Sequence, residues 1–315
     1  METKINLKEE IFRLSIATGF SHRLLEKDYY LTKMLHKISE RRIKNLVFKG
    51  GTCLNKCYLG FYRLSEDLDF VFNQDVSGLS RMQIKKILDN LRRILFDILN
   101  ELNLETSKEL GKGWKMLTSK NEPKIVGLEI IAKYKSLLDD SMQNVKIEIS
   151  FRNKLIIPTK MRPIHHEFIN ALGEPILKED MEIEVIDLAE NFAEKFRALV
   201  TRKNIAIRDI YDIYFILKEE ALKIDEKIIE LSLIKIKESL GLVFTKNDLR
   251  DFIVGLNSKL SNLDEKEILS VLKSEEKVDI KKMVDLIIKL FLTATQEQTQ
   301  ESKKLLTTLI KQETN

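Results

Sequence analysis

The stretch VFKGGTCLNKCYLGFYRLSEDLDFVF, Val47–Phe72, decides the fold that we expect for this chain. An apolar run at Leu46–Lys49 has strand character, and Gly50-Gly51-Thr52 follows as a tight turn. Residues 53–59 then read as a short helix, and residues 67–72 as a second strand. The stretch therefore offers a strand, a glycine turn, a short helix and a second strand that carries two aspartates.

The glycine turn has the features of an anion cradle. Two adjacent glycines let the backbone turn sharply and let a ligand approach closely. The first N–H groups of the helix that follows have no partner inside the helix and attract anions such as phosphate. We therefore expect Gly50, Gly51 and Thr52 to bind phosphate oxygens.

Two carboxylates lie two positions apart in the second strand. Because successive strand residues point to opposite faces, Asp67 and Asp69 share one face, and the apolar residues Leu68, Phe70 and Phe72 share the other. Two carboxylates held in this way can bind Mg²⁺, which prefers oxygen ligands and keeps room for substrate phosphates. An anion cradle beside such a carboxylate pair supplies the two features that metal-assisted nucleotidyl transfer requires at minimum.

The spaced motifs GGT-x-L-x-K and R-x-S-x-D-x-D resemble those of the AbiEii/AbiGii-type toxin nucleotidyltransferases, which belong to the polymerase-β-like nucleotidyltransferase superfamily. Lys27-Asp28-Tyr29 also resembles a family segment, although this helix could simply pack on the back of the sheet. The likeness covers roughly residues 20–220. It implies an α/β (α+β) polymerase-β-like nucleotidyltransferase core, with a small mixed sheet flanked by helices, followed by an all-helical C-terminal domain.

The third carboxylate of the superfamily's metal site is expected on a neighbouring strand. Residues 124–134 and 144–151 read as two strands joined by a turn at Asp139-Asp140-Ser141, and we expect them to pair antiparallel. Glu148 in KIEIS matches the required place, and Glu129 in GLEII is the alternative. Either residue could instead be an exposed strand glutamate.

From Ile183 onward the chain reads almost entirely as helix, so we place a domain boundary near residue 180. The two expected domains are a catalytic domain over 1–180, with N-terminal helices, and a helical domain over 181–315. In the helix expected over 187–202, Lys195 lies at the edge of the apolar stripe, where an unpaired lysine is unusual. It is either a snorkelling lysine or a cation directed at nucleotide phosphates. AEKFRAL resembles the family segment AEK-x-x-AL, which favours the second role.

Asp209 and Asp212 follow in RDIYD, and on a helix they share a face with Ile213 and Ile216. This pattern resembles the R-D-x-x-D element of the family. An alternative interpretation makes Asp209 a helix cap or the partner of a nearby arginine, and it could still support catalysis by holding Lys195.

The resemblance implies a site and a reaction. The catalytic residues are Asp67, Asp69, Glu148, Lys195, Asp209 and Asp212, and the first three hold Mg²⁺, or alternatively Mn²⁺. The expected nucleotide-binding residues are Gly50, Gly51, Thr52, Lys56, Arg63, Ser65 and Lys195. The substrate is an NTP, the expected acceptor is tRNA or another RNA, and a cognate antitoxin is an expected partner. Family members often act as the toxin of a type IV toxin–antitoxin or phage-defence pair.

Composition limits the classes of function and the locations that we expect for this chain. The formal net charge of +4, from 53 basic and 49 acidic residues, is too small for a polybasic nucleic-acid binder, so RNA contacts would need a local patch. Cys53 and Cys57 are expected as free thiols, and with four histidines they form no zinc pattern. No signal-peptide core or long apolar run appears, so we expect a cytoplasmic protein without a membrane contact.

Two other classes of function compete with nucleotidyl transfer. One is a non-catalytic module of the same fold that binds RNA or a protein, although such a module has no need of three neighbouring carboxylates. The other is a related phosphotransferase that uses the same metal site on a different acceptor.

Overall fold

The computed structural model describes residues 6–118, 124–151, 155–256, 258 and 265–294. The chain divides into two compact units. Unit 1 comprises Met1–Asp187 and Val271–Glu276, and unit 2 comprises Leu188–Ser270 and Lys277–Asn315. We describe each unit by itself, and the division of the chain into a catalytic and a helical domain stays a prediction.

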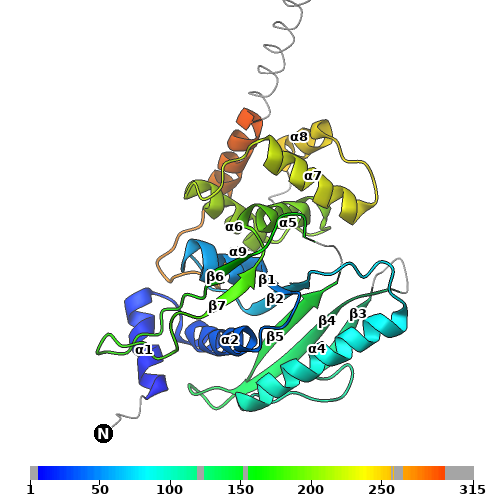
Figure 1. Ribbon diagram of the computed structural model, residues 1–315. Helices are drawn as coiled ribbons and strands as arrows, with labels where there is room; N and C mark the ends of the chain where they lie inside the picture. Colours follow the sequence, from blue (N-terminus) through cyan, green and yellow to red (C-terminus); the bar gives the residue numbers. More distant parts are fainter. Residues whose placement is uncertain (1–5, 119–123, 152–154, 257, 259–264, 295–315) are drawn as a thin grey trace, which may run out of the picture. The chain divides into compact units, whose positions relative to one another are not determined.

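Unit 1 is built on a seven-stranded mixed sheet with the strand order β3-β4-β5-β2-β1-β7-β6 (Figure 1). Strand β1 pairs antiparallel with β2 and parallel with β7, whereas β2 pairs parallel with β5. Strand β5 pairs antiparallel with β4, as expected, and β4 with β3. The strands are β1 Leu46–Lys49, β2 Asp67–Phe72, β3 Trp114–Thr118, β4 Ile125–Lys135, β5 Met142–Ser150, β6 Lys160–Pro163 and β7 Glu182–Val185.

Helices α2 (His22–Arg41) and α4 (Arg81–Glu101) pack on the sheet (Figure 1), and α1 (Leu7–Thr18) packs beside α2. Gly19 ends α1 in the left-handed conformation, as its position predicts. The apolar residues of α2 and α4 share one core with the alternate strand residues Leu68, Phe70, Ile147 and Ile149. The residues between them on β2 and β5 therefore face away from this core.

The segment after β1 differs in detail from the expected turn and helix. Gly50 already begins a helix, α3 (Gly50–Cys53), which continues as one turn of π-helix, η1 (Leu54–Leu59). Gly50 has φ +77°, a conformation that suits glycine and allows the sharp exit from the strand. The residues predicted as a turn are thus the first residues of a ten-residue helical segment, 50–59.

The prediction that the chain is almost entirely helical from Ile183 onward is wrong at its start. Glu182–Val185 is strand β7, where Phe48 of β1 is the partner of Val185, and β6 pairs with β7 on its other side. A four-residue strand with two apolar residues is too short to be told from the end of a helix by periodicity. Only the pairing with β1 and β6 determines its conformation.

A short stretch from late in the sequence returns to unit 1. Val271 is buried, and its carbonyl accepts a hydrogen bond from the Leu64 N–H at 2.9 Å. The N–H and hydroxyl of Ser274 both donate to the Gly19 carbonyl, at 2.8 and 2.9 Å. Residues 271–276 therefore complete unit 1, although they follow most of unit 2 in the sequence.

Unit 2 is helical in the residues that the structure describes. Phe192 and Phe196 of α5 stack with Phe291, whose ring centroid lies 4.6 Å from that of Phe196. These rings form an aromatic centre between α5 and the helix over 280–294. The helices before residue 270 are α5 Leu188–Thr201, α6 Ile207–Lys218, α7 Glu226–Leu240, α8 Lys246–Val254 and α9 Glu265–Leu269.

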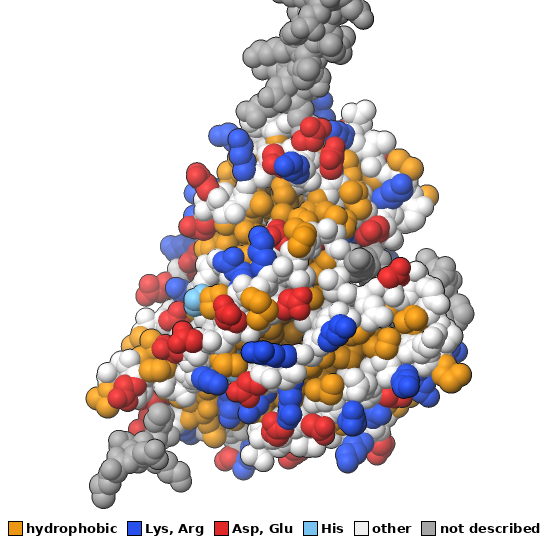
Figure 2. Space-filling model, viewed as in Figure 1, with side chains coloured by type: hydrophobic (Ala, Val, Ile, Leu, Met, Phe, Trp, Pro, Cys, Tyr) orange, Lys and Arg blue, Asp and Glu red, His pale blue; other side chains and the backbone are white. Residues whose placement is uncertain are grey.

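Two further expectations concern charge and membrane contact. On the face shown in Figure 2, basic and acidic side chains are interspersed, as the small net charge suggests.

Within the described ranges, no helix has the length and apolar character needed to cross a membrane.

Candidate active site

A row of charged side chains crosses five strands on the face of the sheet that points away from α2 and α4. The register aligns Lys115 of β3 with Glu129 of β4, Glu129 with Glu148 of β5, Glu148 with Asp69 of β2, and Asp69 with Lys49 of β1. Residues aligned in this way present their side chains on the same face. The structure therefore brings the predicted carboxylates Asp69 and Glu148 to neighbouring positions, with a lysine at each end of the row.

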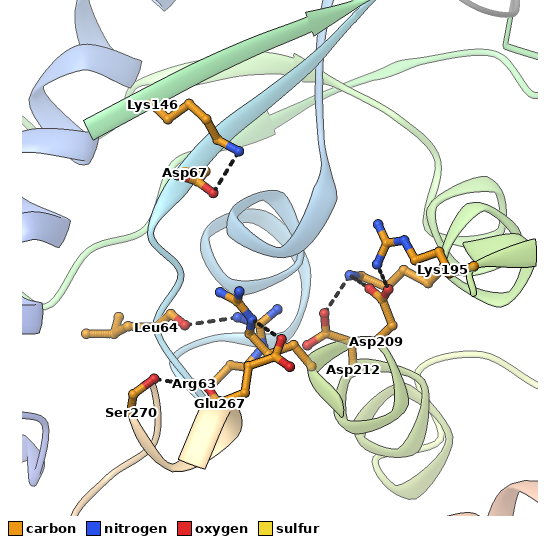
Figure 3. A network of polar contacts seen from close by, with 11 residues as sticks. Arg63, Leu64, Asp67, Lys146, Lys195, Asp209, Asp212, Glu267 and Ser270 are labelled. Atoms are coloured by element: carbon orange, nitrogen blue, oxygen red, sulfur yellow. Dashed lines mark hydrogen bonds and ion pairs between the residues drawn. The ribbon is translucent and has the colours of Figure 1, made fainter. Parts of the chain in front are cut away.

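Asp67 belongs to the same face, and its partner in the parallel register is Lys146. The Lys146 ammonium lies 3.2 Å from Asp67 Oδ2 and 3.8 Å from Glu148 Oε2 (Figure 3). All three side chains are half-buried. A lysine thus links two of the three carboxylates that the sequence predicts as metal ligands.

Asp69 is packed against Gly50, the first residue of the helical segment 50–59, which we call the signature segment. A Cβ atom added at Gly50 would lie 2.6 Å from Asp69 Oδ2, which is closer than real Cβ contacts allow. Gly50 therefore serves both the backbone conformation and the close approach of this carboxylate.

The pKa of Asp69 is raised to about 6. Desolvation of the carboxyl is the largest cause, and the negative charges of Glu148 and Asp67 raise it further, while Lys49 and Lys146 lower it. The carboxylates of Glu148 and Asp67 are thus close enough to Asp69 for their negative charges to raise its pKa.

The second glycine has a similar relation to Arg63. A Cβ atom at Gly51 would collide with Arg63 Nη2 and would lie 3.4 Å from Ser65 Oγ. Arg63 is buried, and its Nη1 donates to the Leu64 carbonyl at 3.0 Å. The predicted phosphate-binding residues Gly51, Arg63 and Ser65 are therefore neighbours.

The hydroxyl of Thr52 is used inside the protein. Thr52 is buried, and its Oγ1 donates to the Asp67 carbonyl at 2.5 Å. This hydrogen bond joins the signature segment to the first residue of the carboxylate strand. The structure thus gives the Thr52 side chain a positioning role and leaves only its backbone for a phosphate.

Lys56 is fully buried rather than exposed to a substrate. Its ammonium lies 2.9 Å from Asp28 and donates to Thr32 Oγ1 at 2.8 Å, both on α2. This geometry does not favour the predicted contact between Lys56 and a nucleotide phosphate, because the charge is already neutralised inside the core. It gives Asp28 of the Lys27-Asp28-Tyr29 segment a specific partner instead of mere packing.

The alternative third carboxylate, Glu129, is also on the row, but it has its own counter-ion. Lys115 Nζ lies 2.8 Å from Glu129 Oε1, and Glu129 is buried. Glu148 is half-buried and is the carboxylate aligned directly with Asp69. The geometry therefore favours Glu148 over Glu129 as the third ligand.

In unit 2, the structure brings together the three predicted residues Lys195, Asp209 and Asp212. Lys195 Nζ lies 2.6 Å from Asp212 Oδ2 and 3.2 Å from Asp209 Oδ1 (Figure 3). Asp209 also pairs with Arg202, in agreement with its alternative interpretation as the partner of an arginine. Because Asp212 is fully buried and Asp209 is nearly so, these carboxylates hold the lysine in a defined orientation.

Asp67, Asp69 and Glu148 fit a hard divalent cation in donor type, and they lie on one face of two paired strands. They offer only oxygen ligands from two paired strands, which suits Mg²⁺ or Mn²⁺. Within the part of the chain that the structure describes, no three His, Cys, Asp or Glu side chains are already close enough together to hold a metal. Loading a cation would therefore require side-chain movements, and Lys146 contacts two of the carboxylates that would move.

Sequence reasoning missed one residue of the site, Lys146, and one pairing, that of Asp28 with Lys56. Lys146 precedes Glu148 by two positions in a strand, so alternation already places both on one face, but its pairing with Asp67 depends on the register of β2 and β5. The pairing of Asp28 with Lys56 has no signal in the local pattern, because an acid in a helix is usually solvated.

Cys53 and Cys57 are not joined in a disulfide bond, as expected, and both are buried. No role in the site follows for them from their surroundings.

Comparison with solved structures finds a similar fold. The crystal structure of JHP933 from Helicobacter pylori is similar over 92% of this chain and 99% of that chain, with a TM-score of 0.52 and 15% sequence identity. A second H. pylori structure, described as a nucleotidyltransferase, has a TM-score of 0.49 at 16% identity and covers 89% of this chain and 98% of that one. An antigenic nucleotidyltransferase-like protein from Paracoccidioides brasiliensis has a TM-score of 0.33 at 14% identity and covers 72% and 93%.

The family follows from the sequence itself. The model of the family described as "Nucleotidyl transferase AbiEii toxin, Type IV TA system" matches residues 41–298, which is most of the chain. The chain therefore belongs to the AbiEii nucleotidyl transferase toxin family, and it is a nucleotidyltransferase with an α/β core. None of the curated proteins matches it in sequence.

Proposed function

We propose that this protein is a Mg²⁺-dependent nucleotidyltransferase that moves an NMP from an NTP to tRNA and acts as the toxin of a type IV toxin–antitoxin or phage-defence pair. The observation that supports it best is the alignment of Asp69 with Glu148, beside Asp67, against a glycine segment whose geometry excludes side chains. Membership of the AbiEii family supports the reaction class and an antitoxin partner.

In unit 1, different residues would bind the metal and the phosphates. Asp67, Asp69 and Glu148 would hold the cation, which supplies charge neutralisation for the triphosphate and activation of the acceptor hydroxyl. The backbone N–H groups of Gly50 and Gly51 would bind phosphate oxygens. Because Arg63 lies directly against Gly51, its guanidinium would add positive charge at the same phosphates.

Lys195 would serve the same reaction as a cation for the nucleotide phosphates. Its two carboxylate partners, Asp209 and Asp212, orient the ammonium within unit 2. This assignment rests on that geometry and on the likeness of its segment to the family motif.

The test is incubation of the purified full-length protein with total tRNA, Mg²⁺ and each α-labelled NTP separately. We expect label transfer to tRNA from one NTP, with release of pyrophosphate, and a loss of at least roughly a hundredfold in Asp69→Ala. Asp139→Ala, which changes an exposed carboxylate in the β4–β5 turn, is the matched control and should transfer label normally.

Two results would contradict the proposal in different ways. Transfer of label from γ-labelled but not α-labelled NTP would identify a phosphotransferase. Binding of tRNA without any transfer, by a folded protein that binds Mg²⁺, would identify a non-catalytic module.

A further inference from the structure

Lys146 occupies an unusual place for a strand lysine. It stands on β5 as the register partner of Asp67 and two residues before Glu148, and its ammonium lies 3.2 Å from the first carboxylate and 3.8 Å from the second. Its side chain is 34% exposed, so it is neither a core residue nor a freely solvated one. Figure 3 shows it pointing directly at Asp67.

The position of this ammonium matters because of the charges around it. Asp67, Asp69 and Glu148 would repel one another if all three were ionised with no cation between them. Lys146 contacts two of the three, and so it supplies positive charge where a divalent cation would otherwise be needed. A cation that uses oxygens of Asp67 and Glu148 must compete with Lys146 for the same atoms.

We propose that Lys146 is a built-in counter-ion that fills the carboxylate site in the metal-free protein and is displaced when the divalent cation binds. This inference rests on the proposed function of the site. A lysine suits the task because its ammonium is a compact charge on a flexible four-carbon stem, which can turn away without movement of the strand. Since Lys146 stays on the same face of the sheet, the displaced ammonium remains on the face that carries the three carboxylates.

Two consequences distinguish this role from that of an ordinary surface ion pair. Without Lys146, the divalent cation no longer competes with this ammonium and should bind more tightly in the absence of nucleotide. Without Lys146 and without metal, the three carboxylates repel one another, so the metal-free protein should be less stable. An ordinary surface pair would affect neither property appreciably.

The experiment is a Mn²⁺ titration of the full-length protein at pH 8 without NTP, followed by electron paramagnetic resonance of free Mn²⁺. Lys146→Met keeps most of the stem and removes the charge. We expect it to bind Mn²⁺ roughly tenfold more tightly than the natural protein. Lys146→Arg, which keeps the charge, should retain the natural affinity.

The matched control is Lys135→Met. Lys135 also lies on the β4–β5 hairpin and pairs with a carboxylate, Asp140, at 2.8 Å, but it stands at the far end of the hairpin from Glu148. Its Mn²⁺ affinity should be unchanged. Melting curves in EDTA show that each variant is folded, and the curve of Lys146→Met should shift to lower temperature and recover with Mn²⁺. If Lys146→Met does not fold, Lys146→Gln takes its place.

The outcomes separate the inference from the proposed function. If the natural protein binds Mn²⁺ and Lys146→Met binds it with equal or lower affinity, Lys146 is not a competing counter-ion, while the proposed metal site stands. If the natural protein binds no Mn²⁺, the metal site of the proposed function fails, and the inference fails with it.

Discussion

At the scale of single residues, the comparison of two glycines distinguishes the cost of a left-handed backbone from the effect of a close contact in the site. Gly50 has φ +77° and Gly173 has φ +82°. An added Cβ meets Asp69 at Gly50 but nothing within 4 Å at Gly173. The two positions thus share a backbone requirement and differ only in what surrounds them.

We predict that Gly50→Ala and Gly173→Ala each lower the free energy of unfolding by about 1–2 kcal/mol through the left-handed backbone. Only Gly50→Ala should also displace Asp69 and abolish Mn²⁺ binding and label transfer. Urea unfolding and the Mn²⁺ titration measure the two effects. Normal Mn²⁺ binding by Gly50→Ala would show that Asp69 is not positioned by this contact.

A second residue-scale feature is the buried histidine of α2. His36 Nε2 has no hydrogen-bond partner among the described residues. Its ring centroid lies 5.9 Å from that of His166, and Lys56, Glu40 and Lys178 are the other charged groups near it. Burial, followed by the charges of His166 and Lys56, lowers the pKa of His36 to about 4.

This pKa predicts a loss of stability in acid. Well above pH 6.5 the ring is neutral in both the folded and the unfolded chain. As the pH falls from there to about 4, His36 becomes protonated in the unfolded chain but stays neutral in the folded chain. The free energy of unfolding therefore decreases, by roughly 3 kcal/mol at most. The difference between the natural protein and His36→Gln in urea unfolding should show this slope.

His22→Gln, which changes an exposed histidine of the same helix, is the control and should leave the slope in place. A slope of the same size in His36→Gln would assign the acid sensitivity to other groups.

At the scale of elements, one buried ion pair fastens the signature segment to α2. Lys56 of η1 and Asp28 of α2 are both buried and lie 2.9 Å apart. The surrounding backbone is tied down as well, because the His165 N–H donates to the Lys56 carbonyl at 2.9 Å and Arg162 Nε to the Cys57 carbonyl at 2.7 Å. The π-helical turn after the glycines is thereby held from two sides.

We predict that Asp28→Asn destabilises the protein by about 3–5 kcal/mol, since it leaves a buried ammonium without its carboxylate. The double substitution Asp28→Leu with Lys56→Met should recover most of this loss, because an apolar pair has no desolvation cost. Asp139→Asn, at the exposed pair with Arg23 of the same helix, should have a much smaller effect in the same urea titration. Equal losses at the two sites would contradict this account.

At the scale of the whole molecule, the chain does not divide at a single point. Residues 271–276 belong to unit 1, although unit 2 begins at Leu188. The chain therefore passes to unit 2 at Leu188 and returns to unit 1 at residues 271–276, whereas the sequence predicts a single boundary, near residue 180. A truncated chain that ends near that boundary would lack the hydrogen bonds of Val271 and Ser274.

We predict that Ser274→Pro, which removes both donors to the Gly19 carbonyl, increases hydrogen exchange in the residues that join α1 to α2. The expected loss of stability is roughly 1–3 kcal/mol. Ser274→Ala keeps the backbone donor and should have a smaller effect. If exchange increases only in the helix over 280–294, residues 271–276 do not support unit 1.

Local sequence patterns determined a large part of this protein. Alternation alone placed Asp67 and Asp69 on one face, and the glycine pair marked the sharp exit from β1, because both depend on neighbours in the chain. The same local motifs predicted the family that the comparisons confirm. The roles of the individual site residues stay predictions until they are measured.

Only the tertiary structure decided which residues meet across elements. The parallel register of β2 and β5 places Lys146 beside Asp67. The packing of η1 on α2 buries Lys56 against Asp28. Glu182–Val185 is a strand because it pairs with the edge of β1. The physical reason is the same in each case. Ion pairs and strand pairings depend on distances between segments far apart in the sequence, and no local pattern of polarity records those distances.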